Sequence, residues 1–246
     1  MANKHGSLSI DSDNLFPIIK KWLYSDHDIF YRELISNGCD AITKLKKLDM
    51  MGEYTLPNDY KAKIQIIVNP EDKTLKFIDN GLGMTADEVE EYICQIAFSG
   101  ATDFIEKYKD KSTDDQIIGH FGLGFYSAFM VSKKIDVISK KAGETEAYIW
   151  SSTGENSYSI EKAEREEQGT TIILHLNDDD TTYATRWTLE SLIKKYSDHV
   201  AYPIYLEYDQ THYEDEKDEN GNPKKTKEHK NEQINSCSAL WRRSKS

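Results

Sequence analysis

The stretch from Phe30 to Leu48 constrains the fold most, because its pattern predicts one long helix with two distinct faces. At about 3.6 residues per turn, its apolar residues form a stripe broad enough to face a protein core: Phe30, Tyr31, Leu34, Ile35, Ala41, Ile42, Leu45 and Leu48. A polar stripe borders the apolar one: Glu33, Asn37, Asp40 and Lys44. Gly38, in mid-helix, costs about 1 kcal/mol relative to alanine, which is easier to explain if another group approaches the backbone there. We therefore expect this helix to form the wall of a site.

Composition and charge limit the class of protein. With 246 residues, 38% of them hydrophobic, the chain can build a sizeable core. Its net charge of −12 argues against a nucleic-acid surface, which needs clustered lysine and arginine. The N-terminus lacks an apolar signal region, and no run approaches the roughly 18 apolar residues of a membrane span. The 3 cysteines are widely spaced and predict neither a disulfide framework nor a zinc site. We expect a cytoplasmic protein that binds neither nucleic acid nor membrane.

The rest of the chain predicts a mixture of helices and strands. Further helices are expected at 15–23, 85–97, 125–131 and 186–200, and strands at 5–11, 63–68, 73–79, 134–140, 146–152, 157–163, 170–177 and 203–209. Residues 98–116 are polar and weakly helical, which favours a flap. Residues 210–233 have dense mixed charge and no periodicity, and this predicts a disordered linker. Residues 234–246 are then the truncated start of another domain.

The first glycine motif, DNGLGM at residues 79–84, follows a predicted strand. Two interpretations have similar weight when the motif is taken alone. It is either an ordinary Asp-Asn-Gly turn or a ligand site. In the second case, Gly81 and Gly83 would let the backbone approach a flat ligand, and Asp79 would accept a hydrogen bond from an exocyclic amine.

The second motif, GHFGLG at residues 119–124, precedes a predicted helix. Its spacing is not that of the dinucleotide-binding fingerprint. Glycines that open a helix expose N–H groups at its positive end, which is a general phosphate site. The alternative is that these glycines only let a loop pack. On the first helix, Glu33 could serve as a general base and Asn37 as an oxygen ligand of magnesium, although a solvated glutamate is the commoner case.

The order of these motifs carries more weight than any one of them. Four motifs follow one another between residues 33 and 170: ExxxNxxD, DxGxGM, GxxGxGF and a GT at 169–170. This series resembles the conserved boxes of the gyrase, histidine-kinase and MutL ATPase superfamily. Three segments resemble the ninety-kilodalton heat-shock chaperone family in particular: RELISNGCDA, GHFGLGFYSAF and GTTIILHL. The resemblance to this family extends over residues 8–208. ALWRRSKS resembles the opening of that family's middle domain.

The resemblance implies a fold and an activity. The fold would be a Bergerat-type α+β two-layer sandwich, with a mixed, mostly antiparallel twisted sheet and helices on one face. Residues 1–209 would be an N-terminal ATP-binding domain that uses ATP or ADP with Mg²⁺. The full-length chain would be a homodimeric chaperone acting on client proteins, and this fragment a monomer with weak ATPase activity, because an arginine of the middle domain is missing. The alternative is a nucleotide- or inhibitor-binding module without turnover.

The resemblance also assigns roles to residues. Glu33 would polarise the attacking water, Asn37 would hold magnesium and phosphate, and Asp40 would support the pocket rim. At the other end Asp79 would bind the adenine amino group, with help from water near Gly83 and Thr170, and Met84 would line the adenine slot. Four residues would wrap the phosphates at the hinge of a lid: Gly119, Gly122, Gly124 and Phe125. The chain departs from the family pattern at Tyr92, Phe98 and His120, and Tyr92 and Phe98 are left out of the expected site.

Overall fold

The computed structural model describes residues 27–94, 124–154, 157–217 and 223–237. In these residues, one eight-stranded sheet has the order β5-β4-β3-β6-β2-β1-β7-β8. The strands are β1 (Ile64–Asn69), β2 (Thr74–Asp79), β3 (Ser132–Lys140), β4 (Ala147–Ser152), β5 (Tyr158–Ala163), β6 (Gly169–Leu176), β7 (Ile204–Lys217) and β8 (Pro223–Gln233). Neighbouring strands are antiparallel except β1 and β7, which are parallel.

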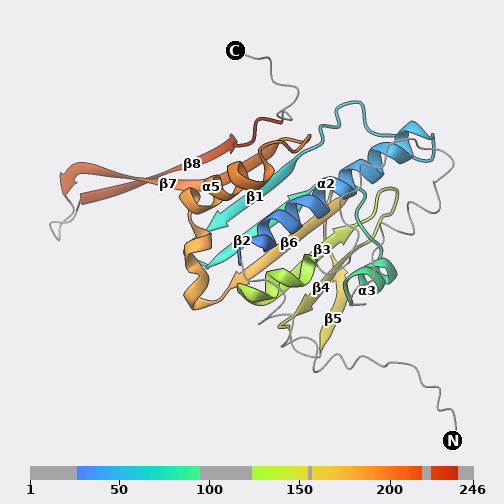
Figure 1. Cartoon of the computed structure of the whole chain (residues 1–246), viewed down its shortest axis with the longest axis horizontal. Coiled ribbons are helices and arrows are strands. Elements are labelled where there is room, and N and C mark those ends of the chain that lie inside the picture. The colour runs from blue at the N-terminus through green and yellow to red at the C-terminus, as the bar shows by residue number, and fades with distance from the viewer. Residues whose placement is uncertain (1–26, 95–123, 155–156, 218–222, 238–246) are drawn as a thin grey trace, which may run out of the picture.

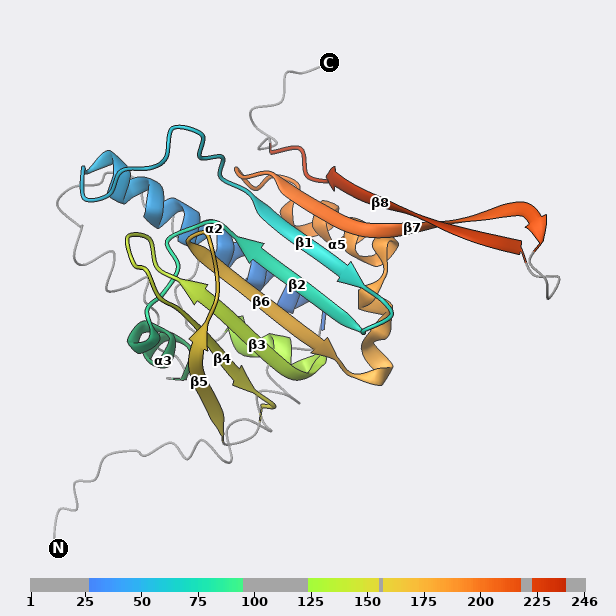
Figure 2. The same ribbon diagram turned by 180° about the vertical axis from the view of Figure 1, so that it is seen from behind.

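The helices lie on one face of this sheet, as the two opposite views show (Figures 1 and 2). They are α2 (Ile29–Met50), α3 (Ala86–Cys94) and α5 (Arg186–Ser197), with 3₁₀ helices η2 (Gly124–Met130) and η3 (Asp178–Ala184). The predicted two-layer α+β fold with a mixed, mostly antiparallel sheet is therefore confirmed. The predicted strand 5–11, the predicted helix 15–23 and the predicted flap 98–116 lie outside the described residues.

The predicted helix at 125–131 is a 3₁₀ helix in the structure. It has 7 residues, which is longer than the roughly three to four residues usual for this kind of helix. The Ser127 hydroxyl donates to the Gly124 carbonyl, three residues earlier, at 2.5 Å. Hydrophobic spacing in the sequence marks this segment as helical and buried, but it does not distinguish the two kinds of turn.

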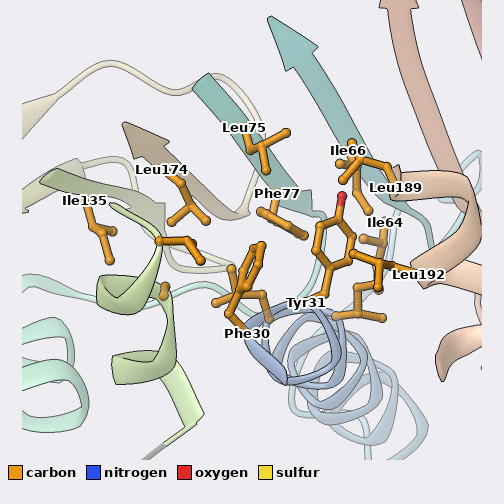
Figure 3. Close-up of a cluster of buried hydrophobic side chains, with 14 of the residues drawn as sticks. Phe30, Tyr31, Ile64, Ile66, Leu75, Phe77, Ile135, Leu174, Leu189 and Leu192 are labelled. Carbon is orange, nitrogen blue, oxygen red and sulfur yellow. The ribbon is translucent and has the colours of Figure 1, made fainter. Parts of the chain in front are cut away.

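The apolar stripe of α2 packs into the centre of the core. Phe30 and Tyr31 are at most 1% exposed, and their rings meet Phe77 of β2 edge-on at centroid distances of 6.4 and 5.0 Å. Leu189 and Leu192 of α5 enclose the cluster from the side (Figure 3). Each such buried side chain contributes about 1.5–3 kcal/mol. This packing fixes the rotation of α2, and with it the direction of the polar stripe.

The segment 210–233 is not a disordered linker where the structure describes it. Residues 210–217 and 223–233 form the outer parts of β7 and β8, which are paired from Tyr205–Gln233 to Lys217–Pro223. The two strands project from the body as a long hairpin (Figures 1 and 2). The domain limits 1–209 and 234–246 stay predictions.

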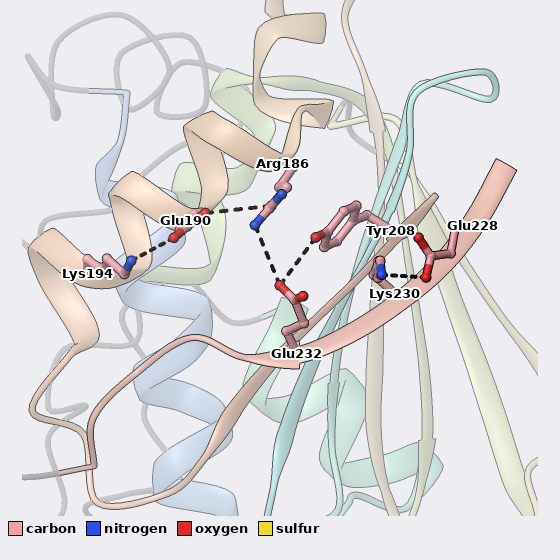
Figure 4. A network of polar contacts seen from close by, with 7 residues as sticks. All are labelled: Arg186, Glu190, Lys194, Tyr208, Glu228, Lys230 and Glu232. Carbon is pink, nitrogen blue, oxygen red and sulfur yellow. Dashed lines mark hydrogen bonds and ion pairs between the residues drawn. The ribbon is translucent and has the colours of Figure 1, made fainter. Parts of the chain in front are cut away.

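Two physical reasons explain why the prediction of disorder was wrong. Strand β7 starts in the core with Ile204 and Leu206, so its register is already set before the charged part begins. Backbone hydrogen bonds of a hairpin need no apolar side chains, and polar side chains also pair across it, as His212 Nε2 and Glu228 Oε2 do at 3.1 Å. At the base of the hairpin, Arg186 of α5 lies 3.6 Å from Glu232 of β8 (Figure 4).

Asp136 joins three strands on the sheet face opposite to the helices. From β3, it accepts hydrogen bonds from Ser151 of β4 at 2.5 Å and contacts Nε2 of His175 on β6 at 2.7 Å. Lys134 completes the group at 2.9 Å. Although burial raises the pKa of Asp136, these hydrogen bonds outweigh it and hold the pKa below its ordinary value. The charged carboxylate therefore stabilises the fold at neutral pH.

Replacing Asp136 by asparagine is expected to lower the free energy of unfolding by about 1–3 kcal/mol at pH 7. Because the folded-state pKa is depressed, this stabilisation is present above the unfolded-state pKa and is lost as the pH falls through the folded-state value. Urea unfolding at several pH values down to the acid range checks the result, with the exposed Asp179→Asn as control. An equal loss at every pH would contradict it.

Candidate functional site

The middle of α2 lies against the end of β2. A Cβ atom added to Gly38 would lie 3.4 Å from the Asp79 Cβ and 3.4 Å from Ile64 Cδ1. These are ordinary van der Waals distances, so the sheet faces the helix at Gly38 without by itself requiring glycine there. This contact places the last residue of β2 beside the helical turn that carries Asn37. Asn37 belongs to the polar stripe of the helix and is half-buried.

Asp79 is a buried carboxylate at the end of a strand. It is 8% exposed, and its Oδ1 accepts the Gly81 N–H at 2.9 Å. Burial raises the pKa of Asp79 to about 6, although the N–H groups of Gly81 and Thr170 and the charge of Arg165 all oppose this increase. Titratable groups with strongly shifted pKa values are concentrated at functional sites. Asp79 is thus the described residue of this region best suited to recognise a ligand.

The DNGLGM turn is packed between α2 and β3. A Cβ on Gly81 would lie 2.4 Å from the backbone carbon of Ala41, and one on Gly83 would lie 1.9 Å from the Lys140 carbonyl oxygen. Gly83 also has φ of +67°, in the left-handed region that favours glycine. Both glycines are therefore required by the packing of the protein itself, so the turn interpretation holds whether or not a ligand binds.

A short chain of hydrogen bonds connects the turn with two strands, β3 and β6. The Met84 N–H donates to Ser139 Oγ at 2.9 Å, and Ser139 Oγ lies 2.9 Å from Thr170 Oγ1. Thr170 is opposite Asp79 in the β2–β6 register, and both side chains are buried. The sequence analysis missed Ser139. The sequence did contain a sign of it. Ser139 is a polar residue at the position where the buried alternation of Ile135 and Val137 would place the next inward-facing side chain.

Glu33 and Gly124 come together at the other end of the site. A Cβ on Gly124 would lie 2.3 Å from Glu33 Oε2, so η2 begins directly against this carboxylate. The Arg32 guanidinium donates to Glu33 Oε1 at 2.9 Å, and the Glu33 side chain is 25% exposed. Two motifs that are far apart in the sequence therefore meet in space.

The remaining predicted site residues lie in different surroundings, and some lie outside the described residues. Asp40 is buried on α2, and Met84 is half-buried at the edge of the core. The ring of Phe125 joins an aromatic cluster, with centroid distances of 5.8 Å to Tyr126 and Trp150. Gly119, Gly122 and the departures Phe98 and His120 lie outside the described residues.

Two negative findings apply to the described part of the chain. It contains no group of three or more His, Cys, Asp and Glu residues that could hold a metal ion. Its helices include none that is long and apolar enough to cross a membrane.

Comparisons with known proteins find relatives over most of this chain. The chaperone protein HtpG of Helicobacter hepaticus is 42% identical over 243 residues, which are 98% of this chain and 39% of the relative. HtpG of Borreliella burgdorferi is 45% identical over 96% of the chain and 37% of the relative. HtpG of Porphyromonas gingivalis is 44% identical over 82% of the chain and 29% of the relative. The chain thus spans well under half the length of the curated relatives that it matches.

A family model described as histidine kinase-, DNA gyrase B-, and HSP90-like ATPase matches residues 31–182. The match begins inside α2 and ends inside η3, so it includes Glu33, Asp79, Gly124 and Thr170. It covers more than half of the chain. The chain therefore belongs to the family of histidine kinase-, DNA gyrase B- and HSP90-like ATPases.

Proposed function

We propose that this chain binds ATP and ADP beside α2 and the DNGLGM turn, and that it hydrolyses ATP slowly. One observation carries the proposal. On the same helix, the backbone at Gly38 contacts Asp79, and Glu33 contacts Gly124. The two contacts are separated by about 7.5 Å of helix axis, to which the side-chain lengths add. A buried acceptor at one end and a carboxylate beside a glycine segment at the other suit the two ends of a nucleotide.

At the adenine end, ionised Asp79 accepts a hydrogen bond from the exocyclic amine, and Thr170 and the backbone near Gly83 complete the polar contacts through water. Met84 lines the slot. Because Asp79 is buried, a purine with an oxygen in place of the amine would leave this acceptor facing another acceptor. IDP should therefore bind far more weakly than ADP.

At the phosphate end, Asn37 supplies an amide oxygen for magnesium, and the N–H groups of Gly119, Gly122 and Gly124 bind phosphate oxygens. The absence of an acidic metal-binding cluster among the described residues fits an ion held mainly by the nucleotide and water. Such an ion neutralises charge on the phosphates. Glu33 acts on the water that attacks the terminal phosphate, while Arg32 donates to its Oε1.

Glu33→Gln tests the catalytic part of this proposal. General-base catalysis contributes about 100-fold or more, so phosphate release in a single turnover should fall by at least about 100-fold. ADP affinity, measured by calorimetry with magnesium, should stay unchanged because the variant keeps the shape of the side chain. Glu144→Gln, in the exposed turn between β3 and β4, is the matched control.

The outcomes of this experiment separate two functions. Lost turnover with retained ADP binding supports the ATPase. If Glu33→Gln hydrolyses ATP as the parent does, Glu33 is not the base. If the parent chain binds ADP but shows no turnover at all, the chain is a nucleotide- or inhibitor-binding module, which is the second candidate.

For the full-length protein, we propose the function named by the relatives, a chaperone acting on client proteins. Nucleotide would close a lid ending at Gly119–Phe125, and closure would favour a homodimer. The support is that Gly124, at the end of that segment, lies against Glu33.

A further inference from the structure

Arg165 reaches the end of β2 from the connection between β5 and β6. Its Nη2 donates to the Asp79 carbonyl oxygen at 3.1 Å, and its Nε donates to the Glu167 carbonyl at 3.0 Å. Its Nη1 bonds the Thr171 hydroxyl. All three contacts are made by one half-buried guanidinium, which ties the ends of β2 and β6 together.

The register of β6 shows on which side of the sheet Arg165 lies. Asp79 is opposite Thr170, so their side chains share a face, and both are buried. The next residue, Thr171, points to the opposite face because side chains alternate along a strand. Arg165 bonds the Thr171 hydroxyl, so its guanidinium lies on the face away from the proposed adenine slot. Arg165 therefore does not touch the nucleotide.

The positive charge of Arg165 also affects the pKa of Asp79. Burial raises the pKa of Asp79, and the Arg165 charge opposes it. The charge of Asp79 in turn acts on Cys39 of α2 and on Tyr60 of the loop before β1, raising the pKa of each further. Asp40, another carboxylate, acts on the same Cys39. Among the described residues, the cation that acts on the Asp79 carboxylate is Arg165, which lies on the far face of the sheet.

We infer that Arg165 is a positioning residue for adenine recognition: it holds the end of β2 from the far face of the sheet and keeps the Asp79 carboxylate charged to accept the exocyclic amine. This inference rests on the proposed role of Asp79. It extends the site to a residue on the second face of the sheet, outside the motifs that the sequence analysis singled out.

The test is the pH dependence of ADP binding to the 246-residue chain, from pH 5.5 to 8.5, for the parent, Arg165→Gln and Arg165→Lys. Loss of a nearby opposite charge raises a carboxyl pKa by about one unit or more. The ratio of parent to Arg165→Gln affinity should therefore increase from near one at high pH to about tenfold at low pH. Ionisation of ADP itself cancels in this ratio. Arg165→Lys keeps the charge but not the three contacts of the guanidinium, so we expect a loss of affinity that is equal at all pH values and the pH dependence of the parent.

Several outcomes overturn the inference. A ratio that is constant over the pH range indicates a merely structural role, and so does Arg165→Lys behaving like Arg165→Gln. Lys162→Met removes an exposed positive charge from β5 and controls for net charge. Arg165→Met is the second neutral variant. If neither neutral variant gives a cooperative thermal transition while Arg165→Lys does, the charge serves folding and the inference is wrong.

Failure of the proposed function would look different. If the parent chain binds no ADP, or if Asp79→Asn binds ADP as well as the parent, Asp79 is not the adenine acceptor. If Asp79→Asn abolishes binding but the Arg165 variants leave its pH dependence unchanged, only the inference about Arg165 fails.

Discussion

Asp79→Asn is expected to abolish ADP binding and, at the same time, to stabilise the ligand-free chain at neutral pH. The pKa of Asp79 is about 6 in the folded chain, against an ordinary value of 3.8. Folding therefore favours the protonated form. The contribution of Asp79 to stability is therefore greatest below pH 3.8, falls as the pH rises towards 6, and is then lower by about 3 kcal/mol. Asparagine avoids this cost, and its side-chain oxygen can still accept the Gly81 N–H.

The gain in stability should depend on pH in a defined way. From the same two pKa values, the difference in unfolding free energy between Asp79→Asn and the parent should be about 3 kcal/mol at pH 7.5 and about 1 kcal/mol at pH 4.5. Urea unfolding measures both, and calorimetry with ADP measures the loss of binding. Asp59→Asn, in an exposed loop, is the control. A variant that is less stable than the parent at pH 7.5 would show that the buried charge is not a cost.

This expected trade-off has a general reason. A carboxylate kept charged in a buried place lowers stability, but it is the acceptor that a ligand amine requires. The chain therefore keeps at Asp79 a residue that the fold alone would not favour. The half-buried guanidinium of Arg165 reduces that cost without entering the slot.

Gly83→Ala is expected to lower the unfolding free energy by about 2–4 kcal/mol and to weaken ADP binding strongly. A non-glycine residue at the φ of +67° costs about 1 kcal/mol, and a Cβ 1.9 Å from the Lys140 carbonyl oxygen forces the backbone to move. The Met84 N–H next to it would move away from Ser139, which is bonded to Thr170. Urea unfolding and an ADP titration check both effects.

Gly143→Ala is the matched control for this prediction. Gly143 also has a positive φ, of +86°, but a Cβ there would meet nothing within 4 Å. Its replacement should cost only the conformational term of about 1 kcal/mol and leave ADP binding unchanged. Equal effects of the two substitutions would mean that the contact with Lys140 has no energetic consequence.

Much of the fold could be predicted from the sequence because local periodicity reports burial. The stripe of α2, the alternation of β3 and the two strands around residues 69–72 are each visible within a short window. The same holds for helix α5. The outer parts of β7 and β8 could not be predicted in this way, since their stability comes from a register set elsewhere in the sheet and from polar side chains paired across the hairpin.

The candidate site divides in a similar way. The sequence by itself determined the residue types at both ends, Glu33 with Asn37 on a helix and Asp79 before a glycine turn, because chemistry is carried by residue identity and spacing. Only the tertiary structure decided what these residues meet. Gly38 contacts Asp79, Gly124 contacts Glu33, and Arg165 supports Asp79 through the sheet. Such contacts join segments distant in the chain, and they depend on strand order and register, which no local pattern contains.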